Sequence, residues 1–162
     1  MAYIKKICIK NARIIFRNFS GKASQFNRNG NRTFSVVLTP EQAKEYEHAG
    51  WHVKYLRPRE PGDEPTPILN VNVRYHSQNP ERNPQLYTVS GRKKTLLTED
   101  TVGTLDFAEL TNVDLLISPY HYNVVSTGES GVSAYLQDGY FTLEDYFGGK
   151  YDFDEEDANE PW

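Results

Sequence analysis

The sequence predicts a mostly β domain, on three observations. Short apolar runs alternate with polar residues along most of the chain, as in strands that bury one face. Gly, Pro and Asn residues, which favour turns, separate these runs. Few stretches show the longer periodicity of helices, and there are no internal repeats. The 162 residues suit one domain with a hydrophobic core of its own.

The first half of the chain is predicted to hold four strands. They are expected at Tyr3–Ile9, Ala12–Arg17, Thr33–Leu38 and Trp51–Leu56, which are rich in β-branched and aromatic residues. Phe16 and Phe34, inside the second and third strands, are expected in the core. The alternation in the fourth strand puts Trp51, Val53 and Tyr55 on one apolar face.

A helix is predicted over Pro40–Ala49. Thr39 can cap it, and Gln42 follows three residues later, as a capping box requires. Pro40 suits the first helical position, and Gly50 suits a left-handed end. A second helical segment is expected to begin at Thr98, although Gly103 weakens its pattern.

The second half is predicted to hold further strands. They are expected at Ile68–Tyr75, Leu86–Val89, Val113–Ile117 and Ser133–Leu136, with Tyr120–Tyr122 continuing the third as an edge. The clearest is Ile68–Tyr75, because its apolar residues alternate with Asn70, Asn72 and Arg74.

Charge is distributed unevenly along the chain. Residues 1–59 carry 12 Lys and Arg and 3 acidic residues, whereas residues 138–162 carry 9 acidic residues and one lysine. A basic half of this kind can meet a polyanion, while the acidic end stays in water or competes for the same surface. Few apolar residues remain beyond Gly148, so we expect residues 1–150 to form the domain and Tyr151–Trp162 to form a disordered tail.

Several function classes find no support in the sequence. The lone Cys8 permits no intrachain disulfide, which favours a reducing cytoplasm. No apolar run approaches the roughly 20 residues of a membrane helix, and no secretory signal is evident. We expect no metal, cofactor or enzymatic activity, since the histidines lack ligand spacing and no phosphate loop occurs. A nuclease would need its Mg²⁺ to be held by acids such as Asp100, Asp106, Glu109 and Asp114.

A basic and aromatic stretch, Asn11–Leu38, carries the main functional signal. Its two apolar runs flank a polar loop, and it contains no acidic residue. The cations are Arg13, Arg17, Lys22, Arg28 and Arg32, and the rings outside the apolar runs are Phe19 and Phe26. Single-stranded nucleic acid requires cations for its phosphates and rings for its bases. A solvated hairpin whose phenylalanines form a small satellite core fits the same residues.

The order of features resembles the phage single-stranded DNA-binding proteins that share the OB-fold. The matching segments are the Asn18–Gly21 loop, the Gly30–Phe34 return, the Asn112–Asp114 strand start and the Gly131–Leu136 strand. Single-strand binders often end in an acidic peptide that closes with an aromatic residue. The corresponding residues here are Asp154, Glu155, Glu156, Asp157, Pro161 and Trp162. This end departs from the bacterial pattern, because it has almost no linker and closes with Trp.

The resemblance implies a five-stranded Greek-key barrel with one or two short helices and a disordered acidic tail. It implies sequence-independent binding of single-stranded DNA in phage replication or recombination, with the tail recruiting partner proteins in the host cytoplasm. The DNA-binding candidates are Arg13, Arg17, Phe19, Lys22, Phe26, Arg28, Arg32, Lys54, Tyr55, Arg57, Tyr75, Arg92, Lys93, Tyr120 and Tyr122. A β-barrel that binds or assembles other proteins, without DNA activity, is the alternative.

Some of these candidates also fit structural roles. Tyr55 and Tyr75 lie on the predicted apolar faces of their strands, where core packing is the commoner role. Tyr120 and Tyr122 follow a proline, and either role fits them. Arg92 belongs to a cationic turn with no acidic residue before Glu99, which favours a phosphate contact.

Overall fold

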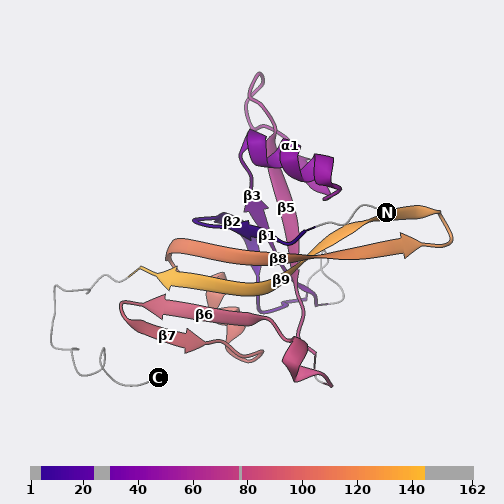
Figure 1. Ribbon diagram of the computed structural model, residues 1–162. Helices are drawn as coiled ribbons and strands as arrows, with labels where there is room; N and C mark the ends of the chain where they lie inside the picture. Colours follow the sequence, from indigo (N-terminus) through magenta and orange to yellow (C-terminus); the bar gives the residue numbers. More distant parts are fainter. Residues whose placement is uncertain (1–4, 24–29, 77, 145–162) are drawn as a thin grey trace.

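The computed structural model describes residues 5–23, 30–76 and 78–144 (Figure 1). Its strands are β1 (Ile7–Ile9), β2 (Arg13–Asn18), β3 (Arg32–Val37), β4 (Val53–Leu56), β5 (Thr66–Val73), β6 (Gln85–Ser90), β7 (Lys93–Leu96), β8 (Leu110–Val124) and β9 (Glu129–Leu143). The helices are α1 (Pro40–Ala49) and two short 3-10 helices, η1 (Pro80–Arg82) and η2 (Val102–Asp106). None of the described helices is long and apolar enough to cross a membrane. The prediction of a mostly β chain is confirmed.

The strands close into a barrel because β1 and β2 act as two halves of one bent strand. The half β1 pairs with β8, and the half β2 pairs with β3. β2 pairs with β3, and β3 pairs with β5, both antiparallel. β5 runs parallel to β9, which pairs antiparallel with β8, and β8 pairs with β1. Asn11, with φ 53°, lies between β1 and β2, and the Ala12 N–H donates to the Val113 carbonyl at 2.7 Å. When β1 and β2 are counted as one strand, the closed circle has five strands, in the order β1/β2, β8, β9, β5 and β3. This arrangement is the predicted five-stranded OB-fold barrel.

Three phenylalanines form the centre of the core. Phe19, Phe34 and Phe141 are each at most 1% exposed. The ring centroid of Phe19 lies 5.0 Å from that of Phe34 and 5.6 Å from that of Phe141. Such aromatic pairs contribute about 0.5–1.5 kcal/mol each beyond their buried area. The contacts hold the segment after β2 against β3 and β9, and the core role predicted for Phe34 is confirmed.

Helix α1 forms where its capping residues predicted it. The Gln42 N–H donates to the Thr39 hydroxyl at 3.1 Å, and the Thr39 N–H donates to the Gln42 side chain at 3.0 Å. Gly50 ends the helix with φ 108°. Ala43 and Tyr46 are buried, so the helix covers one end of the barrel, beside β3 and β5 in Figure 1.

Two hairpins extend the barrel wall. β8 and β9 pair from Leu110 opposite Leu143 to Val124 opposite Glu129, and their far end projects as an arm at the right of Figure 1. Tyr120–Tyr122 thus continues the strand predicted at Val113–Ile117, as expected. β6 pairs parallel with β9 and antiparallel with β7. β5 and β6 thus follow each other along the same edge of β9.

A bulge in β2 overturns the expected position of Phe16. The register with β3 shifts between Ile15 and Asn18, and Phe16 has φ 53°. An extra residue in a strand breaks the alternation of its side chains. Phe16 is consequently 64% exposed, so the prediction that it packs in the core is wrong.

Candidate nucleic-acid interface

One solvent-facing side of the barrel forms a long depression, which we call the trough. Its outward side chains are Asn70 and Asn72 on β5, Arg74 just after β5, Tyr120 and Tyr122 on β8, and Ser133 and Tyr135 on β9. The strand register places Asn72 opposite Tyr135, and Tyr120 opposite Ser133. Two cavities of about 650 and 770 Å³ follow one another along these strands. They form the two halves of the trough.

The first half of the trough, nearer β3 and β4, has a polar floor. Its lining includes Phe16, Thr33, Ser35, His52, Lys54, Asn70, Asn72 and Tyr122. The Ser35 hydroxyl donates to Asn70 Oδ1 at 2.6 Å, and Asn72 Nδ2 donates to the Ala134 carbonyl at 3.1 Å. These bonds fix the floor. None of the described residues lining this half is acidic, so its only full charge is the Lys54 ammonium.

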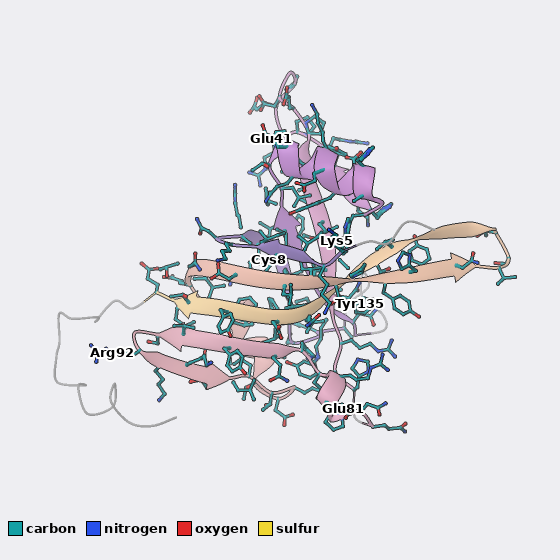
Figure 2. All side chains as sticks on the ribbon, in the orientation of Figure 1. Lys5, Cys8, Glu41, Glu81, Arg92 and Tyr135 are labelled. Atoms are coloured by element: carbon teal, nitrogen blue, oxygen red, sulfur yellow. The ribbon has the colours of Figure 1, made fainter. Side chains whose placement is uncertain are left out.

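The second half of the trough carries charges of both signs. Its lining includes the cations Lys6, Arg74 and Arg82, the acids Glu81 and Asp138, and the rings Tyr120 and Tyr135. The two rings meet edge to face, with centroids 5.6 Å apart and an angle of 70° between their planes. Figure 2 shows Tyr135 at the base of the β8–β9 arm.

Gly131 leaves room for the ring of Tyr122 in the trough. Tyr122 and Gly131 are opposite each other on β8 and β9. A Cβ atom added to Gly131 would lie 2.5 Å from the Tyr122 hydroxyl oxygen. Only glycine therefore lets this ring lie across β9. Tyr122 is 38% exposed and Tyr120 is 59% exposed, so both present ring surface to solvent.

Of the predicted site residues, the trough brings together Lys54, Tyr120 and Tyr122. Five other predicted cations do not line the trough. Arg13 and Lys22 are exposed on or just after β2, and Arg57 is exposed just after β4. Arg92 and Lys93 lie at the β6–β7 turn, and Figure 2 shows Arg92 on the opposite side of the view from Tyr135. DNA contacts by these five residues stay predictions.

Arg17 and Arg32 hold loops to the barrel. Arg17 Nη1 donates to the carbonyls of Leu105 and Ala108 at 2.9 and 2.6 Å. Arg32 Nη1 donates to the Phe19 carbonyl at 2.9 Å, and Arg32 Nη2 lies 3.4 Å from a Glu99 carboxylate oxygen. Both guanidinium groups therefore already have partners within the protein. Their predicted role as phosphate contacts has no direct support from this geometry.

Phe19 is sealed in the core, at 0% exposure. Its predicted role as a stacking ring is wrong, because no base can reach a ring enclosed by Phe34 and Phe141. The satellite-core alternative was closer to the observed structure. Phe26 and Arg28 lie outside the described residues, as do all six residues of the predicted partner-binding tail.

Tyr55 and Tyr75 differ in burial. Tyr55 is 52% exposed, so its predicted place in the core is wrong. Its hydroxyl donates to the Glu47 carboxylate on α1, and this hydrogen bond raises the pKa of Tyr55. Tyr75 is partly buried and packs against the core, with the Arg32 guanidinium 5.7 Å from its ring centroid.

The Tyr75 hydroxyl is enclosed, and no described residue gives it a hydrogen-bond partner. Burial raises the pKa of Tyr75 to about 12, while the nearby positive charge of Arg32 opposes this rise. The phenol is therefore held neutral beside a cation. Tyr75 is a poor candidate for base stacking, since its ring packs against the barrel interior.

Two acidic residues of the nuclease hypothesis, Asp106 and Asp114, accept hydrogen bonds within the fold. Asp106 accepts the N–H groups of Phe19 and Ser20 at 2.5 and 3.2 Å, and also the Ser20 hydroxyl at 2.7 Å. Asp114 accepts the Asn11 N–H at 3.0 Å. Among the described residues, no three His, Cys, Asp or Glu side chains gather as a metal site requires.

The family follows from the whole sequence. It matches the family model of the phage ssDNA-binding domain over residues 1–159. The chain belongs to this family. The sequence matches none of the curated proteins.

The fold of the chain is similar to solved structures of a single-stranded DNA-binding protein from bacteriophage Enc34. The structure of that protein in complex with ssDNA is 11% identical, with a TM-score of 0.55 over 86% of this chain and 87% of that chain. A second structure of the protein is 11% identical, with a TM-score of 0.52 over 96% of this chain and 90% of that chain. This likeness establishes the fold.

Residue patterns in the sequence did not predict most of the residues that line the trough. The missed residues are Lys6, Phe16, His52, Arg74, Arg82 and Tyr135. For Arg74 the sequence does contain a signal: the alternation in the predicted strand Ile68–Tyr75 puts it on a polar face with Asn70 and Asn72. No local pattern predicted Phe16, because a bulge turns it outward.

Proposed function

We propose that this chain binds single-stranded DNA without sequence preference, with the strand lying along the trough. The observation that carries the proposal is one surface of the OB barrel that presents exposed rings beside cations. The rings are Phe16, Tyr120 and Tyr122, and the cations include Lys54 and Arg74. Base stacking contributes about 1–3 kcal/mol per base, and cations neutralise the phosphates. Membership of the family supports the same ligand.

Preference for single strands follows from the same chemistry. The bases of a duplex already stack on one another, so their faces are closed to the tyrosines. Every unpaired base has a free face, and phosphates carry no sequence information, so binding is expected to be blind to sequence. Oligo-dT should therefore bind more tightly than a duplex of equal length.

The biological role we propose is phage DNA replication or recombination, in the cytoplasm of the host cell. The acidic residues of 151–162 would recruit a protein of that process. Before DNA binds, the same negative charge would compete for the basic surface. Removing residues 151–162 should then raise the affinity for oligo-dT, most clearly at low salt, as measured by fluorescence anisotropy. Equal affinities of the full and shortened chains at every salt concentration would remove this competition from the proposal.

Paired tyrosine variants test the placement of DNA in the trough. Tyr120→Ala and Tyr122→Ala should each weaken the binding of labelled oligo-dT by about 5- to 150-fold, the equivalent of one lost stacking contact. Tyr55→Ala is the matched control, because it removes an exposed tyrosine outside the trough. Equal losses in all three variants would refute the placement. If the unmodified chain bound no DNA, the alternative of a protein-binding barrel would take its place.

A further inference from the structure

The outward face of β9 continues beyond the trough. A register shift near Leu116 and Ile117 changes the alternation, so that Asp138 and Tyr140 face outward while Phe141 is buried. β6 runs beside this part of β9 and places Gln85 opposite Asp138 and Tyr87 opposite Tyr140. Because Gln85 and Asp138 line the end of the trough, the next row along the same face is the tyrosine pair.

This tyrosine pair has the geometry of a stacking surface. The rings of Tyr87 and Tyr140 are 14° from parallel, with centroids 5.3 Å apart. Lys94 on β7 places its ammonium 4.5 Å from the centroid of Tyr87 and 5.7 Å from that of Tyr140. Tyr140 is 41% exposed, so the pair still offers ring surface to solvent. We call Tyr87, Tyr140 and Lys94 the platform.

The charge of the β6–β7 hairpin beside the platform favours an anionic ligand. The hairpin carries Arg92, Lys93 and Lys94, and residues 85–98 contain no acid. On the other side of β9, Asp114 lies opposite Tyr140, and its carboxylate accepts the Asn11 N–H at 3.0 Å. An ammonium beside two aromatic faces provides the two contacts that a nucleotide needs, one for phosphate and one for base. The platform thus repeats the chemistry of the trough at the far end of β9.

We propose that the platform is a second contact for single-stranded DNA, and that the strand runs from the trough along β9 to the β6–β7 hairpin. This inference rests on the proposed function and extends its site. The span from Ser133 to Thr142 along β9 is about 30 Å, at about 3.3 Å per residue. The Asp138 carboxylate lies between the two contacts and repels phosphate. The strand therefore has two anchoring regions with a weaker contact between them.

Oligonucleotides of two lengths test the proposal. A thymidine oligonucleotide of about 5 residues fills the trough alone, and one of about 20 residues reaches the platform as well. Tyr140→Ala and Lys94→Gln should weaken binding of the long oligonucleotide by about 5-fold or more and leave the short one unchanged. Tyr140→Phe keeps the ring and should restore long-strand affinity. Lys44→Gln, an exposed lysine on α1, is the control for lost charge.

Each outcome bears on a different step. If the platform variants bind both lengths as the unmodified chain does, the second contact is refuted while the proposed function stands. If Tyr140→Ala weakens the binding of the short and the long oligonucleotide equally, the platform is not a separate contact, and the inference fails. If the unmodified chain binds neither length, the proposed function fails together with the inference. Thermal unfolding of Tyr140→Ala, followed by circular dichroism, checks that the variant is folded, and Lys94→Gln tests the proposal without removing a ring.

Discussion

Phe16 and Phe19 lie three residues apart in one basic segment, yet their rings meet opposite environments. Phe16 is 64% exposed in the trough, and Phe19 is 0% exposed in the core. The bulge after Ile15 makes the difference, because it shifts the alternation by one residue. Phe16 is thereby available to a base, whereas Phe19 contributes to stability.

Alanine variants of the two phenylalanines should therefore lose different properties, one its stability and the other its affinity for DNA. Phe19→Ala should lower the free energy of unfolding by about 3–5 kcal/mol, because it opens a cavity between Phe34 and Phe141. Phe16→Ala should leave stability nearly unchanged and weaken oligo-dT binding. Urea unfolding and anisotropy titrations measure the two effects. A stable Phe19→Ala protein with weakened DNA binding would contradict this assignment.

Tyr75 should make stability depend on pH in the alkaline range. Its pKa is raised from 10.0 to about 12, so the fold favours the neutral phenol. This contribution is complete below about pH 10 and is lost as the pH rises from about 10 through 12, since the unfolded chain ionises first. Tyr75→Phe should remove this part of the decline, as urea unfolding at about pH 9 and about pH 11.5 would measure. Identical losses in Tyr75→Phe and the unmodified chain would show that Tyr75 is not the group responsible.

At the scale of elements, polar contacts fasten β2 and η2 to each other. Arg17 reaches the carbonyls of Leu105 and Ala108, and Asp106 accepts the N–H groups of Phe19 and Ser20. The contacts close over the core where Phe19 enters it. They give Arg17, a cation of the basic segment, a role in the fold.

Arg17→Ala should destabilise the protein by about 1.5–3 kcal/mol, because it leaves two carbonyls without a charged donor. Arg13→Ala is the control on the same strand: Arg13 is exposed, and its loss should change stability by less than about 0.5 kcal/mol. Thermal or urea unfolding of the two variants measures the difference. Similar stabilities of both variants would refute the fastening role of Arg17.

At the scale of the molecule, the position of a cation in the sequence does not decide whether its side chain faces the trough. Arg17 and Arg32, from the basic first segment, have partners within the protein. Lys54 and Arg74, from different parts of the chain, line the two halves of the trough. The cations that face a ligand are therefore set by strand order.

The salt dependence of DNA binding should identify these cations. For a single strand, log K falls with log salt concentration with a slope of about −0.7 per neutralised phosphate. Lys54→Gln and Arg74→Gln should each reduce the magnitude of this slope by about 0.7, whereas Lys44→Gln should leave it unchanged. An unchanged slope in the first two variants would place the phosphates elsewhere.

Part of the site could be predicted because it depends on local patterns. Alternation placed Asn70, Asn72 and Arg74 on one polar face, and the stretch around Tyr120 and Tyr122 was recognised as a candidate. The rest could not be predicted, since Tyr135 and Arg74 meet only through the parallel pairing of β5 and β9. The pairing of Tyr87 with Tyr140 likewise joins strands that are far apart in the sequence.

The sequence by itself determined the mostly β class, the capped helix α1, the charge asymmetry and, through its resemblance, the OB-fold and the ligand class. These follow from periodicity, capping residues and motif order, which are properties of neighbouring residues. The tertiary structure alone decided which rings and cations face solvent together. Barrel closure and the β2 bulge set the orientation of each side chain, and both arise from pairing between strands distant in the chain.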